Sequence, residues 1–274
     1  MKPILVLAMK EFRDGLRNKW VAGATLLLAA LAFALTFLGS TPTGLLDAKP
    51  LSVTVVSISS LTIFLIPLIA LLIGYDAIVG ESERGCLLLM LTYPVSRAQI
   101  LLGKFLGHAA ILAVATLTGY GAAGLAAAIA GNADTASWQA FAGLLASSVL
   151  LGLAFLSLAY LTSVIVTERS TAAGVAVGIW LIFVIVYDLA LMSLLVASKG
   201  GLGADIFPAL LLLNPADAYR LFNLTAFENV REVSGMGGLA SSVRFSPAAL
   251  AATLLAWIIL PLGTALLLFR RREA

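Results

Sequence analysis

Charged residues are scarce in this chain of 274 residues: they make up 11% of it, against 61% hydrophobic residues. A soluble domain carries roughly 25% charged residues, so this composition excludes an ordinary water-exposed surface. The net charge is +3, but the basic residues stand beside apolar runs rather than in one patch, a pattern that membrane orientation explains more simply than nucleic-acid binding. The chain is therefore predicted to lie in a lipid bilayer and to bind no nucleic acid.

Residues for metal binding and catalysis are also few. A single cysteine, Cys86, excludes an intrachain disulfide and a cysteine-based metal cage. His108 is the only histidine, and with Cys86 and Met90 it fits no known metal-ligand spacing, so no metal site is predicted. No Gly-x4-Gly-Lys-Ser/Thr pattern occurs, so the chain does not bind nucleotide through a Walker A loop. We expect no catalytic residues, no cofactor in this chain and no enzyme activity of its own.

Long apolar runs are what the sequence does have. Six of them are long enough to cross a hydrocarbon core, which needs about 20 helical residues: 21–38, 53–75, 105–130, 141–166, 171–197 and 248–269. In lipid, only helices satisfy the backbone polar groups of such runs. Capping patterns mark two starts, Ser96 with Gln99 and Ser246 with Pro247. The sequence predicts an all-α membrane protein, one transmembrane domain (1–274) with six transmembrane helices.

Three segments are predicted to lie outside the bilayer interior. In 1–20 the apolar residues recur every four positions, which indicates an amphipathic helix on the cytoplasmic surface: Ile4, Ala8, Phe12 and Leu16. The segment 76–104 connects the second and third spans on the cytoplasmic side. The long external loop 198–247 precedes the last span, and its apolar stretch 207–213 is too short to cross, so the loop is either periplasmic or re-entrant.

Lys and Arg predict the orientation. Most of the 17 lie in the first 20 residues, in 76–104, at Arg169 and at the C-terminus, whereas the remainder fall mainly in the long loop 198–247. Long loops count least in the positive-inside rule. Both termini are therefore predicted to be cytoplasmic, which agrees with an even number of spans.

The connection 76–104 carries the most informative pattern. Glu81 and Glu83 open a short amphipathic helix that ends before Pro94, and a new helix is capped at Ser96. A short charged helix held between two spans is suited to dock onto a partner and transmit force. The plainer interpretation is a solvated turn, but a turn does not need 29 residues with this capping.

Polar residues inside the spans leave two interpretations open. Asp188, beside Tyr187, lies near the middle of the fifth span, where an unpaired carboxylate costs about 2.5–3.5 kcal/mol. It is either a conduit or gating residue, or a carboxyl bonded to a neighbouring helix. Ser57 and Ser60 in the second span either line the same path or bond to helix backbone, as membrane hydroxyls more often do.

The connection 76–104 resembles that of the ABC type-2 permeases. The resemblance rests on Glu81 to Gly85, on Pro94-Val95-Ser96-Arg97 and on 100–104, while 10–20 resembles the family's N-terminal surface helix. The six-span layout matches over essentially the whole chain. Within the family, the opening, this connection and 212–230 are similar to permeases that serve copper-site assembly of nitrous oxide reductase, a denitrification enzyme.

The resemblance implies a permease subunit of an ATP-driven transporter in the bacterial inner membrane. The implied partners are a second copy of the chain, two cytoplasmic ABC ATPase subunits that hold ATP and Mg, and a periplasmic accessory protein. The residues implied in ATPase contact are Glu81, Ser82, Glu83, Arg84, Gly85, Glu168 and Arg169. Those implied in contact with the periplasmic protein are Asn214, Asp217, Tyr219 and Arg220.

The cargo is left open by the sequence. It is a sulfur or copper species, or the chain transmits ATPase-driven motion to the periplasmic partner without moving cargo. The alternatives are an ABC type-2 exporter of a lipid, peptide or drug, and an ion-driven secondary transporter that uses Asp188. The lack of an internal repeat argues against the last one.

Overall fold

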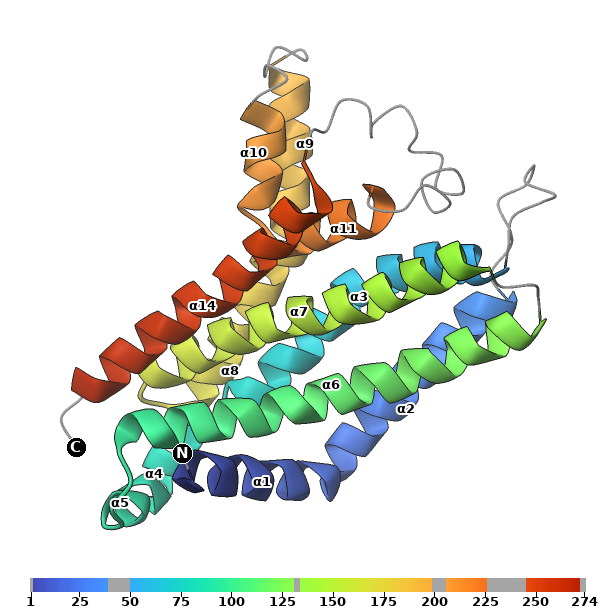
Figure 1. Cartoon of the computed structure of the whole chain (residues 1–274). Helices are drawn as coiled ribbons and strands as arrows, with labels where there is room; N and C mark the ends of the chain where they lie inside the picture. The colour runs from blue at the N-terminus through green and yellow to red at the C-terminus, as the bar shows by residue number, and fades with distance from the viewer. Residues whose placement is uncertain (1, 39–49, 131–133, 199–205, 226–244, 272–274) are drawn as a thin grey trace.

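A computed structural model describes residues 2–38, 50–130, 134–198, 206–225 and 245–271, and in these segments all regular secondary structure is helical (Figure 1). The elements are α1 (Lys2–Leu16), α2 (Lys19–Leu38), α3 (Pro50–Gly74), α4 (Val79–Glu83), α5 (Cys86–Leu91), α6 (Arg97–Ala130), α7 (Thr135–Ile165), α8 (Arg169–Leu181), the π-helical η1 (Ile182–Val186), α9 (Tyr187–Ala197), α10 (Ile206–Leu212), α11 (Pro215–Thr225) and α14 (Pro247–Arg271). The predicted all-α class is confirmed.

The apolar helices are long enough for a membrane protein. Within the described segments, five helical stretches can each cross a bilayer by length and composition, and a sixth crossing results if α1 and α2 count as one broken span. These two helices meet at a bend of 65°. The bend separates the amphipathic α1 from the apolar α2, as the change in pattern near residue 20 predicts.

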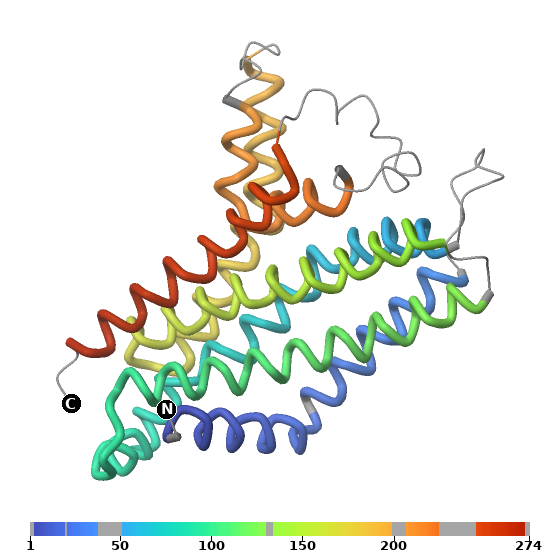
Figure 2. Tube along the Cα trace, viewed as in Figure 1, coloured from blue at the N-terminus to red at the C-terminus, as the bar shows by residue number. Residues whose placement is uncertain are grey.

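The core of the bundle lies around α7. This helix packs against α3 on one side and α14 on another, while α1 and α2 both pack along α6 (Figures 1 and 2). Its first turn is capped by Asp134, whose carboxylate accepts a hydrogen bond from the Ser137 N–H at 3.0 Å. Large aromatic side chains fill the interior, and Phe155 and Tyr160 of α7 are fully buried.

The fifth apolar stretch is not a uniform helix. It runs as α8, the π turn η1 and α9, and α9 continues beyond the bundle, where α10 lies beside it (Figure 1). Of the predicted loop 198–247, residues 206–225 form α10 and α11, and α11 packs on α14, α7 and α3. The glycine-rich beginning of that loop (199–205) and its part 226–244 lie outside the described residues.

Candidate functional site

The connection between α3 and α6 forms a helical hairpin, which we name the coupling hairpin (residues 76–96). Its two helices, α4 and α5, meet at Gly85, whose φ of +70° is a left-handed conformation that other residues rarely adopt. The predicted capping box closes the hairpin: Ser96 N donates to Gln99 Oε1 at 2.9 Å, and Gln99 N donates to Ser96 Oγ at 3.3 Å. α6 begins directly afterwards, so the hairpin is tied rigidly to the start of a long helix.

The first turn of α4 is anchored in the membrane bundle. The backbone N–H groups of Ile78 and Val79 both donate to Ser163 Oγ of α7, at 2.9 and 3.0 Å. All three residues are fully buried. One hydroxyl thus satisfies two backbone donors at a helix start, where donors have no partner within the helix. The hairpin therefore cannot shift without also breaking contacts to α7.

The coupling hairpin and the turn between α7 and α8 form one surface. Glu83 Oε1 accepts a hydrogen bond from the backbone N–H of Arg169 at 2.6 Å, and the Arg169 guanidinium contacts Asp76 at 3.0 Å. Arg84 reaches the same Asp76 oxygen at 3.8 Å. Glu168, next to this turn, accepts a hydrogen bond from the Thr171 hydroxyl at 3.3 Å. The structure thus brings together the two segments that sequence analysis assigned separately to ATPase contact.

This surface presents charged and apolar side chains outward. Ser82, Glu83, Arg84, Glu168 and Arg169 are exposed, whereas Glu81 is mostly covered. Three large side chains of the hairpin are also exposed, in the part of the chain where α5 ends: Leu88, Leu89 and Tyr93. An exposed apolar patch rimmed by charges is typical of a protein interaction site.

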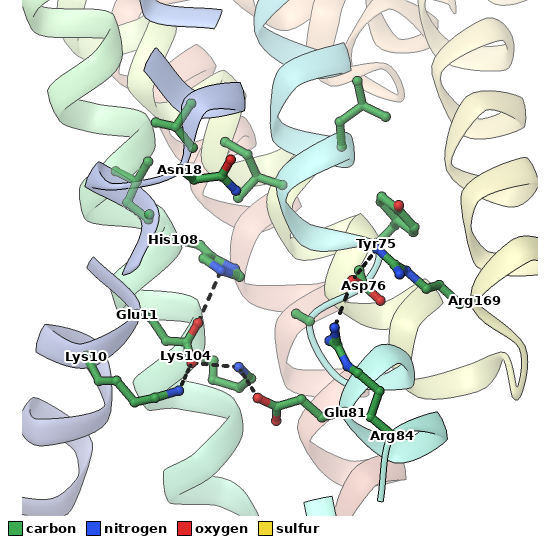
Figure 3. Close-up of a pocket in the computed structure, with 16 residues that line it drawn as sticks. Lys10, Glu11, Asn18, Tyr75, Asp76, Glu81, Arg84, Lys104, His108 and Arg169 are labelled. Atoms are coloured by element: carbon green, nitrogen blue, oxygen red, sulfur yellow. Dashed lines mark hydrogen bonds and ion pairs between the residues drawn. The ribbon is translucent and has the colours of Figure 1, made fainter. Parts of the chain in front are cut away.

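Glu81 has an internal partner instead. Lys104 of α6 is almost completely buried, and its ammonium lies 2.8 Å from Glu81 Oε1 and 2.7 Å from Glu11 Oε1 (Figure 3). The three side chains come from α4, α6 and α1. A buried ammonium between two carboxylates is a strong constraint, because removing one member leaves an uncompensated charge. We name this set the Lys104 triad (Glu11, Glu81 and Lys104).

Helix α1 comes close enough to reach the Lys104 triad because α6 has glycines where the two helices meet. A Cβ on Gly107 would come within 2.8 Å of the Ala8 carbonyl oxygen, and one on Gly103 within 2.7 Å of Leu7 Cβ. Glycine at these positions lets the two backbones approach closely. Burial raises the pKa of Glu11, but the charge of Lys104 and its hydrogen bond outweigh this, so the pKa is lowered overall.

Sequence analysis missed these internal ion pairs. Glu11 and Lys104 are 93 residues apart, and Asp76 stands alone at the end of an apolar run. The one available signal was the cost of a charge inside an apolar stretch, which predicts a partner but not which one.

A second polar cluster lies where α11 meets the fifth apolar stretch. Arg220 of α11 contacts Asp188 at 2.8 Å and Asp217 at 2.8 Å. Asn214 donates to the Phe183 carbonyl of η1 at 2.8 Å and to Asp217 Oδ2 at 3.0 Å. A π turn disturbs the regular helical hydrogen bonds, and Asn214 supplies a donor to one of its carbonyls. Asp188 therefore bonds to a neighbouring helix, as one of the two sequence interpretations held, although the sequence did not identify Arg220 as the partner.

The other residues predicted for this end of the chain are placed as follows. Tyr187 OH donates to the Leu210 carbonyl at 2.7 Å, and Tyr219 OH is 3.1 Å from Ser148 Oγ. Asn214, Asp217 and Tyr219 are buried within the chain, whereas Arg220 keeps 35% of its side chain exposed. Arg220 is therefore the member of this predicted set that offers surface to a partner in the present arrangement.

The hydroxyls of α3 mostly bond to their own helix. Ser60 donates to the Val56 carbonyl at 3.2 Å, and Ser59 and Thr62 make the equivalent bonds to Val55 and Ile58. Ser57 is half-buried on the same helix. A small cavity of about 140 Å³ is lined by both α3 and α11 residues: Ser59, Ser60, Ile63, Phe64, Arg220 and Leu224. The role of Ser57 and Ser60 in a conduit stays a prediction.

Asp217 gives the cluster at α11 a dependence on pH. Burial raises its pKa to about 7, Asp188 adds to the rise, and Arg220 opposes it. The folded state then holds a proton that the unfolded chain, with a pKa of 3.8, has released. Stability is therefore expected to fall as pH rises from about 4 to about 7 and to level off above. Unfolding titrations at several pH values should show this slope, and Asp217→Asn should flatten it.

The matched control is Asp14→Asn, which removes an exposed carboxylate of α1. It should keep the wild-type slope. An equal slope in wild type and Asp217→Asn would contradict the assignment. Glu11 acts in the opposite direction but in a lower range, because its lowered pKa causes loss of stability only as pH falls below 4.5.

The fold and the site define an all-helical membrane protein whose helical hairpin 76–96 is tied to the start of a long helix. Comparison with known proteins identifies the family: the profile of the ABC-2 family transporter protein matches residues 5–274, and the chain belongs to this family. Two relatives carry the name "Probable ABC transporter permease protein NosY", one from Stutzerimonas stutzeri and one from Pseudomonas aeruginosa. Each is 47% identical over 274 residues, with 99% of both chains covered. The protein is thus a permease subunit of an ABC transporter.

Proposed function

We propose that this permease serves the assembly of the copper sites of nitrous oxide reductase, as part of an ATP-driven transporter in the bacterial inner membrane. The proposal is supported by the full-length similarity to two NosY proteins. It moves a sulfur or copper species, or it transmits ATPase-driven motion to a periplasmic partner. Among the described residues, no group of three or more His, Cys, Asp and Glu side chains could hold a metal ion.

The surface formed by the coupling hairpin and the turn between α7 and α8, which we name the coupling surface, is the proposed docking site for the ATPase. It presents the exposed residues Ser82, Glu83, Arg84, Glu168 and Arg169 on one side of the bundle, beside the apolar end of α5. Two separate cytoplasmic ATPase subunits, which bind ATP and Mg, would dock there, one on each copy of the permease. The Lys104 triad would pass their motion to α6 and α1, because it joins the hairpin to both helices.

Two further partners belong to the proposal. A second copy of the chain is supported by the fifth apolar stretch: only 11% of its most apolar window is buried within the chain. A periplasmic accessory protein would contact the region of α10 and α11, with Arg220 as its accessible charge. Both termini would then be cytoplasmic. The ion pair of Asp188 with Arg220 gives no support to ion-driven transport through a free carboxylate.

The docking role is tested by Glu83→Gln. Glutamine can still accept the hydrogen bond from Arg169 N–H, so the hairpin should keep its shape while losing an exposed charge. If Glu83 pairs with a basic residue of the ATPase, affinity should fall at least about tenfold, and ATP turnover by the reconstituted complex should fall with it. ATP hydrolysis in liposomes and co-purification of the ATPase measure the two effects.

Asp14→Asn is the control, since it removes an exposed carboxylate on the same side of the chain but outside the coupling surface. Unchanged ATP turnover in Glu83→Gln combined with Glu168→Gln would contradict the docking role. The copper-site proposal is tested separately. A strain lacking this gene should make nitrous oxide reductase with incomplete copper sites, and normal copper content in that strain would refute it.

A further inference from the structure

Two adjoining cavities lie where α1 bends into α2. The first is a polar cavity of about 500 Å³ bounded by α1, α3, α4, α6 and α8 (Figure 3). The second is an apolar groove of about 450 Å³ between α2 and α6. Val21 and Ile111 are both buried and line both cavities, so the two adjoin at these side chains. A single ligand with a polar head and an apolar tail would reach both by passing these two side chains.

The groove has the depth of one membrane leaflet. Its lining runs from Val21 to Ala29 on α2 and from Ile111 to Gly119 on α6. Eight residue-to-residue steps of helix on each side correspond to about 12 Å, most of the roughly 15 Å that one leaflet contributes to the hydrocarbon core. The hydroxyls of its two threonines, Thr25 and Thr118, bond back to their own helices. The groove thus offers an apolar channel from the bend of α1 and α2 toward the middle of the bilayer.

The polar cavity offers positive charge to a ligand. Its three accessible basic side chains are about half exposed, at 55%, 57% and 50%: Lys10, Arg84 and Arg169. Its three carboxylates are mostly covered, at 11%, 13% and 22%: Glu11, Glu81 and Asp76. Both arginines contact Asp76, and Glu83 lies beside Arg169. Counting Lys104, the lining of the cavity holds four Lys and Arg side chains and three carboxylates, a net charge of +1. An anionic head group is the complement of this cavity.

We propose that the bend between α1 and α2 binds an anionic phospholipid of the cytoplasmic leaflet, with its phosphate in the polar cavity and one acyl chain in the groove. The head group would touch α1, the coupling hairpin and the start of α8 together. A bound lipid would therefore stabilise the arrangement in which the hairpin and the surface helix are joined. Basic residues near the membrane surface attract anionic lipid by about 1 kcal/mol each.

The test is native mass spectrometry of the full chain, purified in detergent and incubated with phosphatidylglycerol or phosphatidylethanolamine of identical acyl chains. Wild type should retain phosphatidylglycerol in preference to phosphatidylethanolamine. Lys10→Gln should reduce this preference about fivefold, as loss of one basic contact predicts. Ala22→Phe fills the groove from an exposed position and should reduce retention of both lipids.

Ala30→Phe is the matched control, because Ala30 is exposed on the same helix but does not line the groove. It should behave as wild type. Thr118→Phe fills the groove from the α6 side and serves if Ala22→Phe fails to fold. Equal retention of the two lipids by wild type would overturn the proposal, as would normal retention in the groove-filling variants. If soluble glycerol phosphate displaced bound phosphatidylglycerol as strongly as added phosphatidylglycerol does, the cavity would be assigned to a free anion instead.

Discussion

Replacing Lys104 by methionine is expected to lower the free energy of unfolding by about 3–5 kcal/mol, the usual cost of removing one partner from a buried ionic set. Lys104 is 3% exposed and holds Glu11 and Glu81 at 2.7 and 2.8 Å. Methionine fills a similar volume but leaves Glu81 without its cation and Glu11 with only the half-exposed Lys10 ammonium at 3.4 Å. Denaturant titration of the purified chain measures the loss.

Two further variants separate charge from packing in this experiment. Lys10→Met removes a lysine of α1 that is 55% exposed, and it should cost less than about 1 kcal/mol. The triple variant Lys104→Met, Glu11→Gln, Glu81→Gln should recover most of the stability, because neutral side chains no longer repel each other. If Lys104→Met were as stable as wild type, the Lys104 triad would not hold α1 and α4 to α6.

Replacing Arg220 by glutamine is expected to cost about 2–3 kcal/mol, as loss of hydrogen bonds to charged groups does. The effect should be smaller than that at Lys104, because 35% of the Arg220 side chain is exposed and solvent screens its charge. Its loss leaves Asp188, inside the fifth apolar stretch, without the cation seen at 2.8 Å. The same titration measures the loss, and pH should modulate it through Asp217.

A double-mutant cycle isolates this pair. Asp188→Asn combined with Arg220→Gln should be more stable than the sum of the two single losses predicts, by 0.5 kcal/mol or more, as coupled residues show. Arg13→Gln, at an exposed position of α1, should be nearly neutral. Additive losses in the cycle would show that Asp188 and Arg220 do not stabilise each other.

The two ionic sets, one buried and one partly exposed, occupy opposite ends of the bundle (Figure 1) and have related consequences. The Lys104 triad joins α1, α4 and α6, and the cluster at Arg220 joins α11 to α9 beside the π turn. Each fixes a segment outside the long helices to one or two of those helices. Motion of the coupling hairpin would therefore reach α6 directly, whereas motion of α11 would reach the fifth apolar stretch. This division fits a subunit that transmits force across a membrane.

Much of this architecture is determined by the sequence. Runs of about 20 apolar residues must become helices in lipid, whatever their neighbours are. Local patterns set the ends as well: Ser96 and Gln99 form the predicted capping box, and Ser246 Oγ accepts from the Ala249 N–H at 3.2 Å ahead of α14. The amphipathic spacing of 1–20 likewise yields a separate helix α1. These features depend on residues within a few positions of one another.

Partners of the isolated charges were decided by the tertiary structure alone. The sequence indicates that Asp188 needs a partner and assigns Glu81 to ATPase contact. Arg220 becomes the partner of Asp188 only because α11 packs beside η1, and Lys104 reaches Glu81 only because α6 passes near α4. Nothing local specifies a contact between Glu11 and Lys104, 93 residues apart. The sequence by itself thus determined where the helices lie and that they cross a membrane, because both follow from local runs of apolar residues. The pairing of charges depends on which helices meet, and only the packed bundle decides that.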